Sequence, residues 1–63
     1  MSFVMIDLVA LDNEDKDYIM GINTKRELRK WKKELNLIDK FIGEFRKGRY
    51  RIIREDKLYD IEG

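Results

Sequence analysis

A chain of 63 residues that contains no Cys and no His excludes several classes of function at the outset. A domain of this size buries only about 60% of its unfolded surface, so its stability is marginal without a disulfide, a metal or a partner subunit. Without thiols or imidazoles, disulfides are impossible and the commonest metal ligand, the usual general bases and thiol nucleophiles are missing. We therefore expect residues 1–63 to form one small domain that has no cofactor, no metal and no enzymatic activity.

The charges are unevenly distributed along the chain. Residues 1–23 carry a net charge of −4, residues 24–54 carry +8 and residues 55–63 carry −3, which leaves +1 for the whole sequence. Such asymmetry favours an anionic partner, but a basic face neutralised by the chain's own acidic ends explains it equally well. The absence of Cys fits a reducing compartment, and no apolar run approaches the ~20 residues of a membrane span. We expect a cytoplasmic protein that does not bind membranes.

The first predicted element is a strand over residues 3–11, in which Asp7 is the only polar residue. A strand that is apolar on both faces is typical of the centre of a sheet. Residues 12–16 predict a turn, because Asp and Asn tolerate left-handed backbone. A calcium loop that starts at Asp12 would need Gly at its sixth position and Glu at its twelfth, but the sequence has Asp17 and Asn23 there. A second strand over residues 17–22 completes a hairpin with the first.

The longest predicted element is an amphipathic helix over residues 24–48. Thr24 and Glu27 have the spacing of a capping box, which marks a helix start. The apolar residues that follow recur every three or four positions and form one stripe: Leu28, Trp31, Leu35, Ile38, Ile42 and Phe45. Gly48 is a natural residue to end the helix. A break near Asn36 remains an alternative, because a continuous helix directs Leu37 into its basic face.

A third strand is predicted over residues 49–54, followed by a turn at 55–57 and a tail at 58–61 that adds a fourth, edge strand or lies on the surface. After the helix, a right-handed crossover pairs the third strand with the first. The predicted fold is therefore α+β with the layout β-β-α-β(-β). Three or four strands form an antiparallel or mixed sheet in the order 2-1-3, and one long helix covers one face. The tail or a second subunit would cover the other face.

The basic side of the predicted helix contradicts a local rule of helix stability. Cations in the first turn meet the positive end of the helix dipole, and several of them repel one another one turn apart. Sequences that break such rules often do so at functional sites. The predicted residues for binding a partner or phosphates are therefore Lys25, Arg26, Arg29, Lys30, Lys33, Arg49 and Arg51. The competing interpretation is screening by the acids of the tail, which are Glu55, Asp56, Asp60 and Glu62.

Two aromatic residues need a choice between core and binding roles. Trp31 belongs to the apolar stripe, which favours the core or an interface over stacking on a base. Tyr50 lies between Arg49 and Arg51, an arrangement that suits single-stranded nucleic acid, although strand alternation favours the core.

Three functions remain open from the sequence. The leading hypothesis is a small non-enzymatic binding protein, adaptor-like or inhibitor-like, that acts by protein–protein interaction. The alternatives are a nucleic-acid-binding protein that uses the basic helix face, and a homodimeric structural protein joined through the helix or the open sheet face. A charge of +1 weakens the nucleic-acid hypothesis, because dedicated domains of that kind usually have a pI above about 9.

Overall fold

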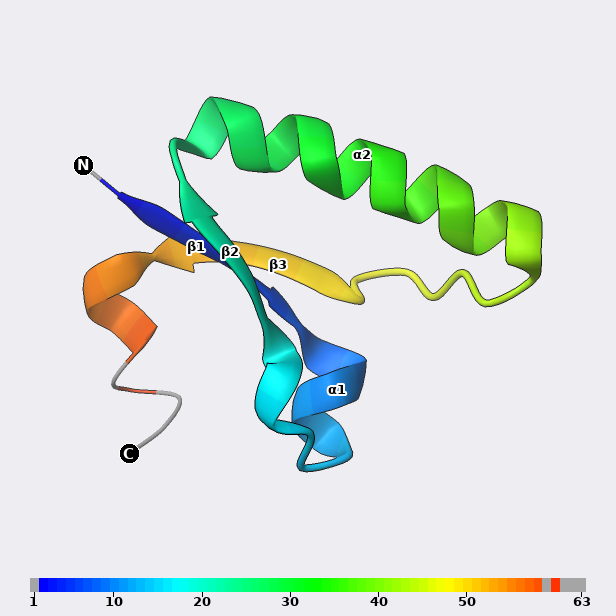
Figure 1. The fold of residues 1–63 in the computed structure, drawn as a ribbon, viewed down its shortest axis with the longest axis horizontal. Helices are drawn as coiled ribbons and strands as arrows, with labels where there is room; N and C mark the ends of the chain where they lie inside the picture. The colour runs from blue at the N-terminus through cyan, green and yellow to red at the C-terminus, as the bar shows by residue number, and fades with distance from the viewer. Residues whose placement is uncertain (1, 59, 61–63) are drawn as a thin grey trace.

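The computed structural model of the chain, which describes residues 2–58 and 60, consists of a small antiparallel sheet and one long helix that packs on it (Figure 1). The elements in chain order are β1 (Phe3–Asp7), α1 (Leu8–Asp12), the 3₁₀ turn η1 (Lys16–Tyr18), β2 (Ile19–Asn23), α2 (Lys25–Ile42), β3 (Tyr50–Arg54) and the 3₁₀ turn η2 (Glu55–Lys57). The strands lie in the order β2-β1-β3. The predicted α+β class, the β-β-α-β layout and the sheet order are confirmed.

β1 lies in the centre of the sheet, as its apolar character predicts. It pairs antiparallel with both neighbours, so that Val4 lies opposite Ile22 of β2 and opposite Ile53 of β3. The pairing with β2 is irregular between Met5 and Ile6. Because both edge strands are antiparallel to β1, β2 and β3 run parallel to each other, and α2 is the crossover that connects them.

The core lies between α2 and the face of the sheet that carries Met5. Met5, Leu28 and Tyr50 are buried together, and three half-buried side chains pack against them: Phe3, Leu35 and Ile52. Trp31 lies on Gly21 of β2 so closely that a Cβ atom at this glycine would come within 2.9 Å of the indole ring. Gly21 is therefore required by the approach of an aromatic ring to the strand.

The first strand is shorter than predicted, because the chain enters helix α1 directly after Asp7. The Asp7 carboxylate accepts hydrogen bonds from the amides of Val9 at 3.0 Å and Ala10 at 3.4 Å, which makes this residue the N-cap of α1. The prediction of one strand over residues 3–11 is wrong from Leu8 onward. β2 likewise begins at Ile19 and not at residue 17, because η1 precedes it.

α2 begins at the predicted cap and passes through Asn36 without a break. The Thr24 hydroxyl accepts the amide of Glu27 at 3.3 Å, which is one half of the predicted capping box. The second bond of the box, from the amide of Thr24 to the Glu27 carboxylate, is replaced by other contacts. The amide of Thr24 donates to the side chain of Asn23 at 2.8 Å, and the Glu27 carboxylate pairs with Lys30 at 3.6 Å. The continuous helix is confirmed, whereas the alternative break is wrong.

The end of α2 comes earlier than predicted. The helix stops at Ile42 because Gly43 adopts a left-handed conformation with φ of 77°. The amide of Gly43 donates to the carbonyl of Lys40 at 3.3 Å, and the amide of Glu44 donates to the carbonyl of Asp39 at 2.8 Å. This pair of bonds is a Schellman motif, which closes a helix at the first suitable glycine. Gly48, with φ of 79°, lies in the loop that leads to β3.

The face of the sheet opposite α2 carries Val4 and Ile6, and both side chains are fully buried. Leu8 and Leu11 of α1 and residues 57 and 60 of the C-terminal segment line a groove of about 370 Å³ beside Ile6. The described part of the tail thus contributes to this face, as one of the two predictions proposed. Leu58 has a helical backbone, and two residues of the predicted fourth strand, Tyr59 and Ile61, lie outside the described residues.

Candidate functional site

One arginine joins the loop after α2 to the rest of the fold. Arg49 donates to both carboxylate oxygens of Asp7, from Nε at 3.1 Å and from Nη2 at 2.9 Å, and its Nη1 donates to Oδ2 of Asp39 at 3.1 Å. The Tyr50 hydroxyl donates to the same Asp39 oxygen at 2.8 Å. Asp7 and Asp39 are both buried. We call these four residues the Arg49 cluster; it closes the core where β1, α2 and β3 meet.

The electrostatics of the Arg49 cluster indicate a structural role. Burial would raise the pKa of Asp7, but the hydrogen bonds from Arg49, Ala10 and Val9 and the charge of Arg49 outweigh burial and lower that pKa. The hydrogen bond to Asp7 raises the pKa of Arg49, against the effect of burial. Burial and the hydrogen bond to Asp39 raise the pKa of Tyr50 to about 12. These three groups each keep one protonation state near neutral pH, which does not suit proton transfer.

The predicted binding residues do not form one continuous surface. Five of them lie on the exposed part of α2: Lys25, Arg26, Arg29, Lys30 and Lys33. Arg49 is half-buried in its cluster, and its donors point to carboxylates of the same chain. Arg51 alternates with the core residues of β3 and lines the groove on the opposite face of the sheet. The structure therefore places the five helix residues on one surface. Arg49, in the loop before β3, and Arg51, in β3, lie away from that surface.

Screening of the basic helix residues by direct contact with the tail is not observed in the described part of the chain. Over residues 2–58 and 60, Arg26, Arg29 and Lys33 form no ion pair, while Lys25 Nζ lies 5.7 Å from the centroid of the Phe3 ring. Asp56 pairs with Arg54 at 3.6 Å. Glu62, another acid of the proposed screen, lies outside the described residues.

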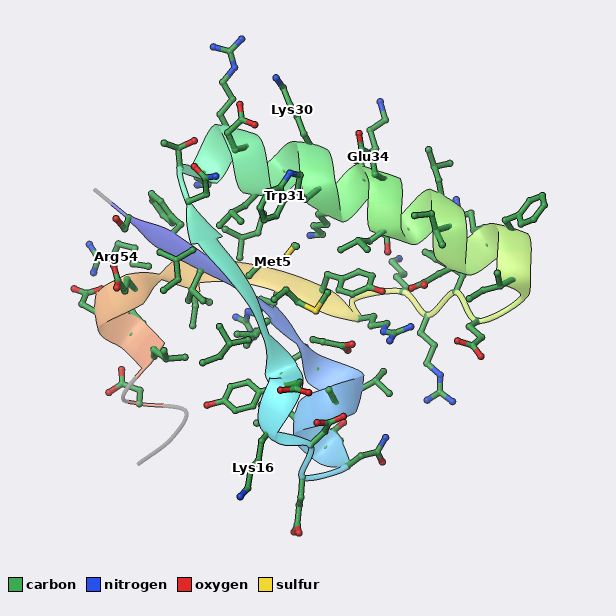
Figure 2. The ribbon with its side chains drawn as sticks, viewed as in Figure 1. Met5, Lys16, Lys30, Trp31, Glu34 and Arg54 are labelled. Carbon is green, nitrogen blue, oxygen red and sulfur yellow. The ribbon has the colours of Figure 1, made fainter. Side chains whose placement is uncertain are left out.

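The apolar stripe of α2 packs on the sheet only in its first half. Leu28 is fully buried and Leu35 contacts the core, whereas Trp31 on Gly21 is 40% exposed. Figure 2 shows Lys30 pointing away from the sheet and Trp31 on the side of the helix that faces it. The C-terminal end of α2 extends beyond the strands, and the loop that leads to β3 runs below it (Figure 1).

The overhanging end of the helix carries a group of large exposed apolar side chains, which we call the distal apolar surface. Its members are Leu37 (58% exposed), Ile38 (55%), Phe41 (92%), Ile42 (56%) and Phe45 (41%). Within the helix, Phe41 lies four residues after Leu37 and three after Ile38, and Ile42 lies four after Ile38, so these side chains are neighbours on its surface. Monomeric soluble proteins rarely expose large contiguous apolar patches, and those that they do expose are often binding sites.

A shallow groove continues from this surface toward β2. It has a volume of about 320 Å³ and is lined by Met5, Met20, Trp31, Glu34, Leu35 and Ile38. Met20 of the edge strand β2 is also exposed. The exposed apolar area therefore extends from the end of α2 along its side to β2.

The sequence contained part of the signal for these features. The apolar spacing predicts that Ile38, Ile42 and Phe45 belong to one stripe, but periodicity carries no information about the length of the sheet beneath them. Asp39 follows Leu28 by eleven residues and Leu35 by four, which places it on the buried side of a helix. A buried aspartate there requires a cation, and Arg49 in the following loop is one candidate that this pattern indicates.

Two further classes of site are not found in the part of the chain that the structure describes. Residues 2–58 and 60 contain no group of three or more acids placed to hold a metal ion. No helix among them combines the length and the apolar composition needed to cross a bilayer. No protein-family model, curated protein or solved structure matches this chain.

Proposed function

We propose that this chain is a small non-enzymatic binding protein that acts by docking on another protein through the distal apolar surface. The observation that carries the proposal is the exposure of five large apolar side chains, four at the C-terminal end of α2 and one, Phe45, in the loop that follows it. Leaving such area in water costs about 25 cal/mol per Å² relative to burial, so a partner that covers it gains that free energy. Phe41, with 92% of its surface in water, is the natural anchor for a pocket on the partner.

Two features of the chain support a protein partner over a catalytic role or a nucleic acid. The Arg49 cluster ties up its polar groups in hydrogen bonds within the fold, and the chain lacks His and Cys. Of the seven basic residues predicted for phosphate binding, Arg49 is neutralised by two carboxylates and Arg51 faces away from the helix. As part of the same proposal we place the protein in the cytoplasm, since a chain without Cys fits a reducing compartment.

The test is a quantitative pull-down from cytoplasmic extract with the chain as bait, comparing three variants with the unmodified protein. Ile42→Asp places a charge in the distal apolar surface, where the side chain is 56% exposed. Ile22→Asp makes the same change at a side chain of similar exposure, 51%, on β2 outside that surface. Lys25→Glu with Arg29→Glu reverses two charges at the other end of α2.

The proposal expects a protein partner that is retained by the Ile22→Asp and Lys25→Glu/Arg29→Glu variants and lost by Ile42→Asp. Thermal melts of all variants must show that each bait is folded at the temperature of the assay. If Ile42→Asp retains every partner that the unmodified chain retains, docking through this surface is wrong. Loss of the partner only with Lys25→Glu/Arg29→Glu would move the contact to the basic helix residues.

A further inference from the structure

Positive charge borders most of the distal apolar surface. Four cations lie next to its members along the helix or directly after them in the loop: Lys33, Lys40, Arg46 and Lys47. Lys40 Nζ lies 4.8 Å from the centroid of the Phe45 ring, which keeps its ammonium at the edge of the apolar side chains. The acids on the same border are Glu34 and Glu44. The border therefore has an excess of positive charge.

These cations are free to meet a ligand. None of the four forms an ion pair with any described residue, and all are exposed. Arg46 also lines a groove of about 330 Å³ beside Phe45, together with Val9, Gly43, Glu44 and Arg49. Because the donors of Arg49 are directed to Asp7 and Asp39, Arg46 is the cation in this groove whose guanidinium can bind a carboxylate.

We propose that the occupant of the distal apolar surface is an acidic amphipathic segment of the partner protein. Its apolar side chains pack on Leu37, Phe41, Ile42 and Phe45, and its carboxylates pair with the bordering cations. Charges of opposite sign around an apolar centre are the arrangement that selects one partner over another at protein interfaces. This inference rests on the proposed function and adds the chemistry of the partner.

The same charges argue against two other occupants. A second copy of the chain, packed face to face, would bring the two sets of cations together, and like charges in contact destabilise an interface. A nucleic acid would need flat stacking surfaces along a basic groove, but three of the five members are aliphatic, and Glu34 and Glu44 repel phosphates.

The test uses two synthetic amphipathic helical peptides of roughly 15 residues that share the same leucines. One carries Glu at all polar positions and the other carries Lys. Binding is measured by titration with NMR detection of the backbone amides of the full chain. The proposal expects the acidic peptide to bind with shifts concentrated at residues 37–47, and the basic peptide not to bind.

The decisive variant reverses three bordering charges: Lys40→Glu, Arg46→Glu and Lys47→Glu. We expect it to weaken binding of the acidic peptide about tenfold or more and to bind the basic peptide instead. The matched control is Lys25→Glu, Arg26→Glu and Arg29→Glu, the same change of charge at the other end of α2. Arg29, the nearest of these three residues, is about 16 Å from Lys40 along the helix, beyond the screening length of about 8 Å at physiological salt, so the control keeps its affinity within about twofold.

Three outcomes would overturn the inference. Equal binding of both peptides shows that the border does not select charge. Tighter binding of a single-stranded oligothymidylate to the same residues assigns the surface to nucleic acid. A concentration-dependent dimer in sedimentation velocity that Ile42→Asp abolishes assigns it to a second copy. If neither peptide binds while the pull-down still depends on Ile42, the proposed partner chemistry is wrong and the proposed function stands. If the pull-down does not depend on Ile42 either, both proposals are wrong.

Discussion

Asp7 and Arg49 are joined by two hydrogen bonds, of 2.9 Å and 3.1 Å, although 42 residues separate them in the sequence. The same carboxylate caps α1 through the amides of Val9 and Ala10. One buried aspartate thus ends the central strand, starts a helix and holds the loop before β3. Removal of either partner leaves a buried charge without its full set of hydrogen bonds, which is expensive in free energy.

Arg49→Gln should destabilise the fold by about 3–5 kcal/mol, because Asp7 and Asp39 lose their counter-charge while remaining buried. A chain of this size has a free energy of unfolding of roughly 3–9 kcal/mol in total, so the variant should be largely unfolded at elevated temperature. Arg51→Gln, at an exposed residue of β3 two positions after Arg49, should cost no more than about 0.5 kcal/mol. Urea denaturation of both variants measures the difference, and equal losses would show that the Arg49 cluster adds nothing to stability.

The lowered pKa of Asp7 predicts a loss of stability in acid. The carboxyl group binds a proton more weakly in the folded chain than in the unfolded chain. Its contribution to stability is therefore complete above the unfolded pKa, near 4, and is lost as the pH falls through the lower pKa of the folded state. Urea midpoints between pH 7 and pH 2 should show the gap between the unmodified chain and Asp7→Asn narrowing below about pH 4. A gap that stays constant with pH would contradict the shift.

The raised pKa of Tyr50 predicts a second loss of stability, at alkaline pH. Burial and the hydrogen bond to Asp39 raise its pKa to about 12, above the ordinary value of 10. Because the folded state keeps the phenol proton, this contribution is complete below the unfolded pKa and is lost between about pH 10 and pH 12, to a maximum of roughly 3 kcal/mol. Tyr50→Phe removes this dependence, and absorbance of the phenolate near 295 nm, compared between the two proteins, should assign the late ionisation to Tyr50.

Gly21→Ala should destabilise the chain by about 1–3 kcal/mol, because the new methyl group meets the Trp31 ring at 2.9 Å. The loss should shrink to about 0.5 kcal/mol or less when Trp31→Leu is present in the same chain, since leucine leaves room above the strand. A double-mutant cycle by urea denaturation measures this coupling. Equal costs of Gly21→Ala with and without the indole would show that strand propensity, and not the ring, selects the glycine.

The overall arrangement of the chain could be predicted because local and long-range signals agree. Thr24 marks the start of α2, and the uninterrupted spacing from Leu28 to Ile42 gives one helix. The apolar character of β1 on both faces places it between the other strands. Given these elements, the rule of right-handed crossovers leaves few alternatives for β3.

The sequence-based predictions are wrong where one residue type suits two structural roles. The apolar pattern treats Asp7 as a single polar residue within a strand, although an aspartate is also a preferred N-cap, and Asp7 caps the five residues of α1. The sequence favours Gly48 as the helix end because Gly48 follows Arg46 and Lys47, whereas Gly43 follows the apolar pair Phe41 and Ile42. Both glycines adopt left-handed backbone, and the helix ends at the first of them. The prediction that Arg49 binds a partner is not supported, because Asp7 and Asp39, distant in the sequence, converge on it in the fold.

The position of β1 in the sheet has a consequence for the order of folding. Phe3 pairs with Asn23 in the next strand and with Arg54 near the far end of the described chain. During synthesis the ribosome releases β1 well before β3, and until then one edge of the central strand has no neighbour. A two-stranded hairpin is at best marginal in water, so the sheet is complete only when the longest-range pairing closes. A nascent chain halted inside α2 therefore presents its most apolar strand to chaperones and to other chains.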